Sequence, residues 1–303
     1  MEFRRIGKIF GPEDYLPNAS TYASLPFAVE KDGATFRIYC STRDSDNHSF
    51  GVSFDYDVEK QSVDEVNVEN PIIERGDAGL FDESGVSLSC YCAELSRFYY
   101  LGWSLRTKVP FSNQIGSGVL SGDSLKMEKK ARIPILAKTS EEPFSVGYPT
   151  VTFIHGRYLM YYDVILEWTG KNSGNFEYRS ELRYAESRDG KRWKRTNHCC
   201  LAPERKNGEV AVSRPAIWRD GTKFHMLVSV LYSGGNYKLG YASSEDGITW
   251  NRDDTVVEFE PRGNGWDSDE ISYPSVFRYH DSLYMLYNGN SYGKTGVGIA
   301  EII

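Results

Sequence analysis

The sequence has little cysteine, little proline and no excess of basic residues. Its 303 residues include five Cys and 12 Pro, and 35 Lys and Arg against 42 Asp and Glu give a net charge of −7. An odd, small number of cysteines in a chain of this length does not fit a disulfide framework. The Cys90–Cys92 and Cys199–Cys200 pairs lack the spacing of a zinc site. We therefore expect structural cysteines, no protein-ligated metal and no cofactor.

Long apolar runs are also missing. No segment approaches the roughly 20 apolar residues that cross a bilayer, and the first ten residues, MEFRRIGKIF, contain neither an apolar core nor a cleavage site typical of a signal peptide. We expect a cytoplasmic protein that does not insert into membranes. The acidic balance argues against nucleic-acid binding. The one basic stretch, Lys126–Arg132, is interpreted as a solvent-exposed loop.

Aromatic residues are abundant: 21 Tyr, 15 Phe and 6 Trp make 14% of the chain. Aromatic side chains favour strands, because they suit a pleated, half-buried surface. No segment sustains a helical period of apolar residues. The fold class is therefore predicted to be all-β.

Two hairpins share one pattern, Y-A-x-S-x-D-G-x-x-W. It runs from Tyr184 to Trp193 and again from Tyr241 to Trp250. Asp and Gly make a tight turn, in which Asp accepts from nearby backbone N–H groups and Gly supplies a positive φ. The Trp then packs back on the hairpin. The pattern predicts a hairpin and indicates nothing about catalysis.

A second repeat divides the whole chain. Short apolar segments align on Pro26, Leu88, Pro149, Pro215 and Pro274, at intervals of about 60 residues. No linker or change in composition interrupts the series. We expect five equivalent units within a single domain, residues 1–303.

Each unit is expected to contain four strands. In the fourth unit these are Arg214–Trp218, Lys223–Leu231, Tyr237–Ser243 and, outermost, Thr255–Phe259, with Pro71–Glu74 and Ile133–Lys138 as outer strands of other units. The fifth unit ends after three strands, and Phe3–Phe10 belongs to no unit. The simplest solution is a five-bladed β-propeller with four-stranded blades, in which the N-terminal strand closes the last blade and removes an exposed edge.

In such a propeller the innermost strands line a central channel, and the segments leading into them open on the ligand face. Carboxylates precede three inner strands at matching distances, and we predict Asp82, Glu209 and Asp269 as a catalytic set. Like charges brought together would raise one pKa and produce a general acid. The competing interpretation is that these acids cap turns or face solvent. Predicted substrate-binding residues on the same face are Arg43, His48, Glu83, Trp103, Arg214, Glu270, Tyr273 and Asn290.

The chain resembles the five-bladed glycoside hydrolase superfamily of arabinanase/xylosidase-like and invertase-like enzymes. The residues that carry this resemblance are the two hairpins, the Pro-led segments, Phe81–Val86, Gly102–Trp103, Val109–Asn113, Gly265–Ser268, Tyr273–Pro274 and Tyr284–Gly293. It is most similar to glycosidase-like proteins of bacterial surface-polysaccharide clusters and to the N-terminal domain of glucosamine inositolphosphorylceramide transferases. The resemblance implies a sugar or glycan ligand and polysaccharide-biosynthesis enzymes as partners, and some relatives hold a cation in the channel through water and a His.

One departure from the superfamily affects its chemistry. The resemblance implies catalytic Asp residues immediately before the inner-strand prolines of the first blades, with a Glu acid further on. Here those positions hold none: they are Leu25, Ser87, Tyr148, Arg214 and Tyr273. Glycoside hydrolysis needs two carboxyl groups about 5–9.5 Å apart, so hydrolysis here requires relocated acids.

Three functions therefore stay open. The first is a glycoside hydrolase or transglycosylase acting on a surface-glycan or sugar-nucleotide intermediate. The second is a non-catalytic sugar-binding propeller that assists a polysaccharide-biosynthesis partner. The third is a protein-interaction propeller. A polar, acidic and aromatic channel mouth favours sugars, whereas a flat apolar face favours proteins.

Overall fold

The computed structural model describes residues 1–11, 21–67, 69–122, 125–129, 131–170 and 176–303. The chain is almost entirely β, as predicted. Within the described residues, the helical elements are three 3₁₀ turns, η1 (Ala93–Leu95), η2 (Arg205–Asn207) and η3 (Asp254–Val256), and the short turn α2 (Asn290–Gly293). None of the helices in these ranges is long and apolar enough to span a bilayer.

The strands pair antiparallel in five groups of four. The first is β2 (Thr21–Asp32), β3 (Thr35–Arg43), β4 (Ser49–Asp57) and β5 (Ser62–Val66), and the second is β6 (Gly85–Cys92), β7 (Arg97–Leu105), β8 (Phe111–Leu120) and β9 (Met127–Lys129). The third is β10 (Ser145–Ile154), β11 (Arg157–Thr169), β12 (Glu177–Ser187) and β13 (Lys194–Leu201), and the fourth is β14 (Glu209–Asp220), β15 (Lys223–Tyr232), β16 (Tyr237–Ser244) and β17 (Asn251–Arg252). Single parallel bridges, Ser49 with Gly85 and Ser180 with Ala211, connect neighbouring groups.

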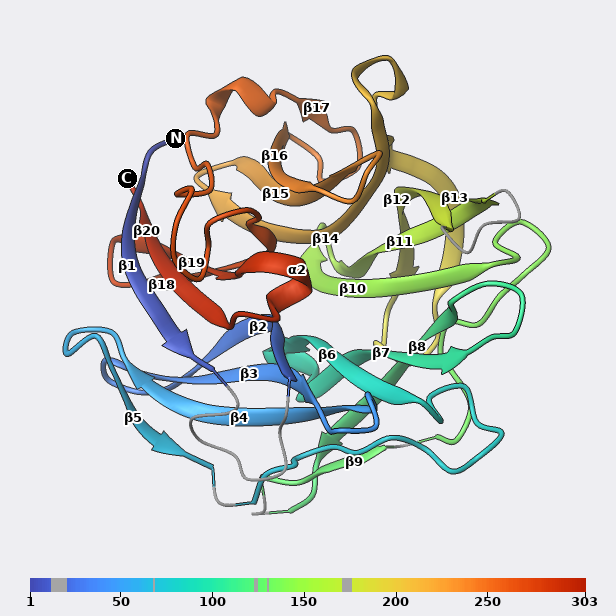
Figure 1. Ribbon diagram of the computed structural model, residues 1–303, viewed down its shortest axis with the longest axis horizontal. Helices are drawn as coiled ribbons and strands as arrows, with labels where there is room; N and C mark the ends of the chain where they lie inside the picture. Colours follow the sequence, from blue (N-terminus) through green and yellow to red (C-terminus); the bar gives the residue numbers. More distant parts are fainter. Residues whose placement is uncertain (12–20, 68, 123–124, 130, 171–175) are drawn as a thin grey trace.

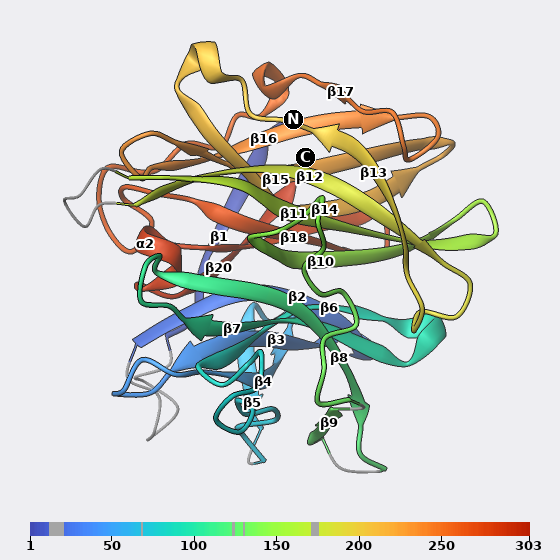
Figure 2. The same ribbon diagram turned by 90° about the vertical axis from the view of Figure 1, so that its right-hand side faces the viewer.

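The last group draws on both ends of the chain. Its strands β18 (Ser272–Tyr279), β19 (Ser282–Asn288) and β20 (Val297–Ile302) are followed outward by β1 (Phe3–Phe10), which pairs antiparallel with β20. The chain ends lie side by side (Figures 1 and 2), and Ile303 N–H donates to the Glu2 carbonyl at 2.9 Å. Phe10 is buried and stacks on Phe54 of the first group, with ring centroids 4.4 Å apart.

The first strands of the five groups lie next to one another in a ring. β2 contacts β6, β6 contacts β10, β10 contacts β14, β14 contacts β18, and β18 contacts β2. Residues from all five of these strands line one cavity of about 130 Å³, which we call the axial cavity. Figure 1 shows the five groups arranged around this common centre.

The repeated hairpin forms as its sequence predicts. In the third group Asp189 Oδ1 accepts from the N–H groups of residues 191 and 192, and Gly190 has a φ of 66°. Asp246 and Gly247 repeat this arrangement in the fourth group, with a φ of 72°. The two turns therefore follow from local chemistry.

The proline segments form bulges on the first strands. Pairing shifts by one residue at Pro26, Pro149, Pro215 and Pro274. The residue before each proline has a positive φ, and these residues are Leu25 (57°), Tyr148 (49°), Arg214 (52°) and Tyr273 (54°). A bulge bends its strand and redirects a side chain, so the residues in the superfamily's catalytic positions are set apart from the regular alternation.

Some strand boundaries differ from the sequence predictions. The outer strands of the first and second groups are β5 and β9, and not the predicted residues 71–74 and 133–138. Those two segments form no strand and pair only through the isolated bridges of Ile73 and Leu136. The basic stretch predicted to be a loop contains β9, because Met127 is buried and pairs with β8. The outer strand of the fourth group is β17 rather than residues 255–259, since the Asp253 carboxylate accepts from Thr255 N–H and starts η3.

The alignment of the second unit is wrong by one residue. Its bulge lies between Leu88 and Cys90, so Ser89 rather than Leu88 occupies the position of the prolines. A serine in this place gives no signal in the sequence. The residue before it, Leu88, is also not a carboxylate, so the departure from the superfamily stands.

Candidate functional site

The structure gives Asp82, predicted as catalytic, two partners inside the second group. Its buried carboxylate lies 2.7 Å from Lys129 Nζ and accepts from the Tyr100 hydroxyl at 3.3 Å. Lys129 is on the outermost strand and Tyr100 on the second strand. The contact therefore joins the outer and inner parts of one group.

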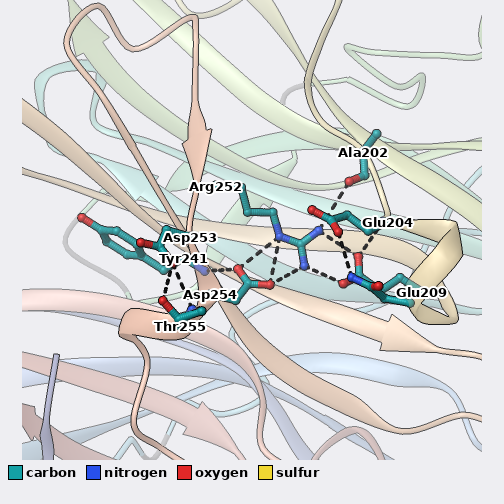
Figure 3. Close-up of polar contacts among 9 residues, drawn as sticks. Ala202, Glu204, Glu209, Tyr241, Arg252, Asp253, Asp254 and Thr255 are labelled. Carbon is teal, nitrogen blue, oxygen red and sulfur yellow. Dashed lines mark hydrogen bonds and ion pairs between the residues drawn. The ribbon is translucent and has the colours of Figure 1, made fainter.

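Glu209 is held in the same manner. Arg252 of β17 donates to both of its oxygens, at 2.8 and 2.9 Å, and the Glu204 N–H donates at 2.7 Å. Arg252 also donates to Asp254, which in turn accepts from the Tyr241 N–H at 2.8 Å. Figure 3 shows this network, in which the guanidinium lies between the two carboxylates.

Equivalent acids recur in the other groups. Glu142 accepts from the Tyr162 hydroxyl at 2.9 Å and from Arg195 at 2.6 Å. Asp267 accepts from the Tyr287 hydroxyl at 3.2 Å and from Arg5 of β1 at 3.1 Å. Two members of the predicted catalytic set, Asp82 and Glu209, therefore belong to a repeated ion pair between the entrance to the first strand and the outer strand of a group. In the last group Asp267, and not Asp269, holds this place. Catalysis by Asp82 and Glu209 stays a prediction.

Three further predicted residues lie in loops. Glu83 accepts from the Gly79 N–H at 2.6 Å, and the His48 N–H donates to Asp44 at 2.9 Å. Asp269 is exposed, and its backbone N–H donates to Asn290 Oδ1 at 2.8 Å. Asn290 lies beside the cluster of tyrosines described next.

Five tyrosines from the last three groups and their loops gather where the bulges converge, and we call them the tyrosine cluster. The Tyr273 hydroxyl donates to Tyr237 at 2.9 Å, the Tyr178 and Tyr237 hydroxyls lie 3.2 Å apart, and Tyr148 donates to Tyr292 at 3.3 Å. The Tyr273 ring lies 4.8–5.3 Å from three of the other rings. Tyr178, Tyr237 and Tyr292 are only half-buried, so the cluster has a solvent-facing side.

Most predicted binding residues surround this cluster. The Arg43 guanidinium lies 5.7 Å from the Tyr292 ring centroid and 5.5 Å from that of Trp103. Asn290 Oδ1 accepts from the N–H groups of both Asp269 and Glu270, at 2.8 and 3.0 Å. The structure thus brings together five predicted binding residues, Arg43, Trp103, Glu270, Tyr273 and Asn290. The guanidinium of a sixth, Arg214, is directed to the carbonyls of Ser89 and Pro26 at the axial cavity.

Glu270 is the predicted acid nearest the tyrosines. It is 7% exposed, and its Oε1 accepts from the Ser272 hydroxyl at 3.0 Å and from the Tyr292 N–H at 3.3 Å. Burial raises the pKa of Glu270 above its ordinary value, although these two hydrogen bonds oppose the rise. The group therefore holds its proton more tightly than an exposed Glu.

Asp163 of β11 is a second buried acid beside the cluster. It is 3% exposed, and burial raises its pKa to about 7. Its charge acts on the hydroxyls of Tyr148 and Tyr178, and that of Glu270 acts on Tyr237, raising their pKa values further. Two acids whose pKa values are raised thus share one aromatic cluster.

In three other groups, the second-strand residue that corresponds to Asp163 bonds to the next group. These residues are Ser41, Ser229 and Asn288, and each accepts from a backbone N–H of the neighbouring first strand at 2.6–3.0 Å. Asp163 Oδ1 has no hydrogen-bond partner among the described residues. Interactions with the backbone N–H groups of Asp163 and Gly147 lower the pKa of this carboxyl group against the effect of burial, so of its two oxygens Oδ1 is the one that the described residues leave without a partner.

The sequence analysis did not find Asp163. The available signal was a single acid inside the apolar run Leu159–Ile165, LMYYDVI. A carboxylate in a buried strand is rare unless it is paired or functional.

A channel cation, as in some relatives of the resembling superfamily, does not fit this chain. The axial cavity is lined by Arg214 and by no His, Asp or Glu. Within the described ranges, no group of three or more His, Cys, Asp or Glu side chains is arranged to hold a metal.

Two Mycobacterium tuberculosis proteins align with the whole chain. The uncharacterized proteins Rv1502, from strain ATCC 25618 / H37Rv, and MT1551, from strain CDC 1551 / Oshkosh, are each 35% identical over 308 residues, covering 100% of this chain and 99% of theirs. The chain belongs to their family. No family model matches it.

Three solved structures similar to this member of the Rv1502 family bear the names of enzymes that act on carbohydrates. A glycoside hydrolase superposes with a TM-score of 0.74 at 13% identity, covering 98% of this chain and 91% of that one. The catalytic domain of the Coprinopsis cinerea GH62 α-L-arabinofuranosidase gives 0.66 at 11% identity, covering 99% and 96%. A Listeria innocua β-1,2-mannobiose phosphorylase, in complex with β-1,2-mannobiose, gives 0.68 at 12% identity, covering 100% and 97%. The chain therefore has the fold of the propeller glycosidases, as the resemblance implied.

Proposed function

We infer that the five strand groups are the blades of a single-domain, five-bladed propeller closed by the N-terminal strand. The pairing of β1 with β20 and the ring of contacts among the first strands support this inference. The tyrosine cluster then lies at one end of the channel, the usual ligand position of a propeller.

We propose that the protein is a carbohydrate-active enzyme, a glycoside hydrolase or transglycosylase that acts on a surface-glycan or sugar-nucleotide intermediate. The observation that carries the proposal is the pair of buried acids, Asp163 and Glu270, beside the tyrosine cluster. Tyr and Trp rings stack on sugar faces, and their hydroxyl and indole N–H groups bond sugar oxygens. Glycosidic bond cleavage uses two carboxyl groups, one as the general acid and one as the base or nucleophile, and different environments set their pKa values apart.

The proposed roles follow from the two environments. Asp163, with a pKa near 7, is half-protonated at neutral pH, and it donates its proton to the departing glycosidic oxygen. Glu270, aligned by Ser272 and the Tyr292 N–H, accepts the proton of the water or sugar hydroxyl that attacks the anomeric carbon. Arg43 and Asn290 orient the sugar at the solvent-facing side. Asp269, exposed beside Glu270, stays a third candidate acid.

The test is release of sugar from a panel of glycosides and sugar nucleotides. We expect Asp163→Asn and Glu270→Gln each to lower kcat by at least about 100-fold, the scale of one general acid or base. Asp82→Asn is the matched control, because it removes a buried acid of the repeated ion pair. Loss of activity in Asp82→Asn or Asp269→Asn with full activity in both other variants would restore the sequence-based set.

A second candidate function is a non-catalytic sugar-binding propeller. The observation that favours it is the replacement of the superfamily's pre-proline acids by Leu25, Tyr148, Arg214 and Tyr273, while the aromatic surface is kept. Calorimetry with the same panel separates the two. Binding without turnover by the unmodified protein supports the module, and no binding to any sugar counts against both.

We propose that the protein works in the cytoplasm beside enzymes of polysaccharide biosynthesis. Its resemblance to glycosidase-like proteins of surface-polysaccharide clusters supports this setting. All five cysteines are free thiols, as is usual in a reducing compartment. Co-purification with a glycosyltransferase from the same cells would support the assignment, and secretion of the protein would contradict it.

A further inference from the structure

A buried arginine lies at the centre of the ring of first strands. Arg214 is the bulge residue of β14 and is 2% exposed. Its Nη1 and Nη2 donate to the carbonyls of Ser89 and Pro26, on two other first strands. Its Nε has no hydrogen-bond partner among the described residues.

Arg214 also lacks a charge partner. Every other buried arginine network described above contains a carboxylate, but none of the described acids forms an ion pair with Arg214. Burial lowers its pKa to about 10, so it still carries its charge at neutral pH. Two carbonyl dipoles satisfy two donors but supply no negative charge, and a buried unpaired charge is costly.

The axial cavity lies against this guanidinium. Its lining combines Arg214 with the hydroxyl-bearing residues Ser89, Tyr91, Thr150 and Ser275, with Cys90 and with apolar residues, and it has no acidic lining residue. The Ser89 hydroxyl is buried and also has no partner among the described residues. Ala28, Ile217 and Ser275 of its wall are half-buried, so solvent reaches it.

We propose that the axial cavity binds one small inorganic anion, of which chloride is the natural source. An anion here supplies the missing counter-charge and accepts from Arg214 Nε–H and the Ser89 hydroxyl. A water molecule can accept the same hydrogen bonds but leaves the charge uncompensated. With about 130 Å³, the cavity has room for a halide or a single small oxyanion. Arg214 connects three first strands, β14, β6 and β2, and the anion would stabilise this connection as a structural ligand. Its binding is independent of the sugar chemistry proposed above.

The direct test is a bromide-soaked crystal of the unmodified protein. We expect an anomalous peak within about 3.5 Å of the Arg214 guanidinium, a hydrogen-bonding distance for a large anion. A peak at surface sites only, with none in the axial cavity, overturns the proposal. This result needs no enzymatic activity, so it is separate from failure of the proposed function.

A thermal measurement gives the binding in solution. Replacing sodium gluconate by sodium chloride at constant ionic strength should raise Tm by several degrees in a saturable manner, because a ligand of the native state stabilises it. Arg214→Met should remove this response. Arg183→Met is the control, since Arg183 is paired with Glu142 and Glu181, and its response should equal that of the unmodified protein. Equal responses to both anions in the unmodified protein overturn the proposal, and if Arg214→Met does not fold, the bromide peak decides.

Discussion

The hydroxyl of Tyr273 donates to that of Tyr237 across 2.9 Å, although the two residues come from different blades of the proposed propeller. Tyr273 stands immediately before an inner-strand proline, the place that the resemblance assigns to catalytic Asp residues on the first blades. On the fifth group this position holds an aromatic ring and a hydroxyl. The hydrogen bond between Tyr273 and Tyr237 therefore lies at the proposed sugar site and also connects two of these blades.

Removing that hydroxyl should weaken sugar binding more than stability. In Tyr273→Phe the ring contacts remain, but Tyr237 loses its donor, so we expect a roughly tenfold rise in Kd for the sugar, the effect of one hydrogen bond. Calorimetry measures it. Tyr99→Phe is the control, because the Tyr99 hydroxyl bonds the Gly190 carbonyl in a hairpin remote from the cluster. Equal Kd values for Tyr273→Phe and the unmodified protein would exclude this hydroxyl from the site.

Asp163 should make the protein less stable as pH rises. Its pKa is raised to about 7 in the folded state, whereas in the unfolded chain it is near 3.9. The folded state therefore binds the proton more tightly between these values. The contribution is full below about pH 4 and is lost as pH rises to 7, on the order of 4 kcal/mol at most. Chemical denaturation at pH 4.5 and 7.5 should show this loss, and Asp163→Asn should reduce it.

The same group sets a limit on activity. If Asp163 is the general acid, kcat/KM falls above about pH 7 as the carboxyl group loses its proton. A profile that stays flat from pH 6 to 9 on a substrate with a poor leaving group would contradict that role.

Glu209 should contribute to stability and not to turnover. In Glu209→Gln, Arg252 keeps Asp254 but loses the negative charge of a buried partner and one of its two hydrogen bonds to residue 209, and we expect a cost of about 2–3 kcal/mol. Urea unfolding measures the cost, and kcat of the folded protein should be unchanged. The exposed Glu258 gives the control, Glu258→Gln, with a change within about 0.5 kcal/mol. A stable but inactive Glu209→Gln would return Glu209 to the catalytic set.

The N-terminal strand should be required for folding. Phe10→Ala removes a buried ring that stacks on Phe54, and we expect a loss of about 3–5 kcal/mol. The half-exposed Phe144 serves as the comparison, since Phe144→Ala should change the free energy of unfolding by less than 1 kcal/mol. Similar small changes in both variants would show that β1 is not an integral strand.

Local signals in the sequence predicted the fold well. The Asp-Gly turns at Asp189 and Asp246 and the prolines at Pro149 and Pro215 act through backbone conformation, which depends on a few adjacent residues. Where this signal was missing, the alignment of the repeats was wrong by one residue: the second unit has Ser89 in place of a proline. The outer strands were less predictable, because they are short and their pairing depends on long-range contacts such as that between Arg252 and Glu209.

The site could be predicted only in part. Glu270, Tyr273 and Asn290 lie close in the chain, and the structure keeps them together. Asp82 and Glu209 looked equivalent to Asp269, but their partners, Lys129 and Arg252, lie 47 and 43 residues away, beyond any local pattern. Asp163 has only a weak signal in the sequence, a single acid in an apolar run, and its burial beside the tyrosines is what distinguishes it.

The central claim is that Asp163 and Glu270 flank the sugar at the tyrosine cluster, and a crystal structure of the Glu270→Gln variant with a bound glycoside tests it most directly. The account predicts a sugar ring on the tyrosine cluster with its glycosidic oxygen within about 3.2 Å of the Asp163 carboxyl group. A sugar bound elsewhere, for example beside the ion pairs of Asp82 or Glu209, would contradict it.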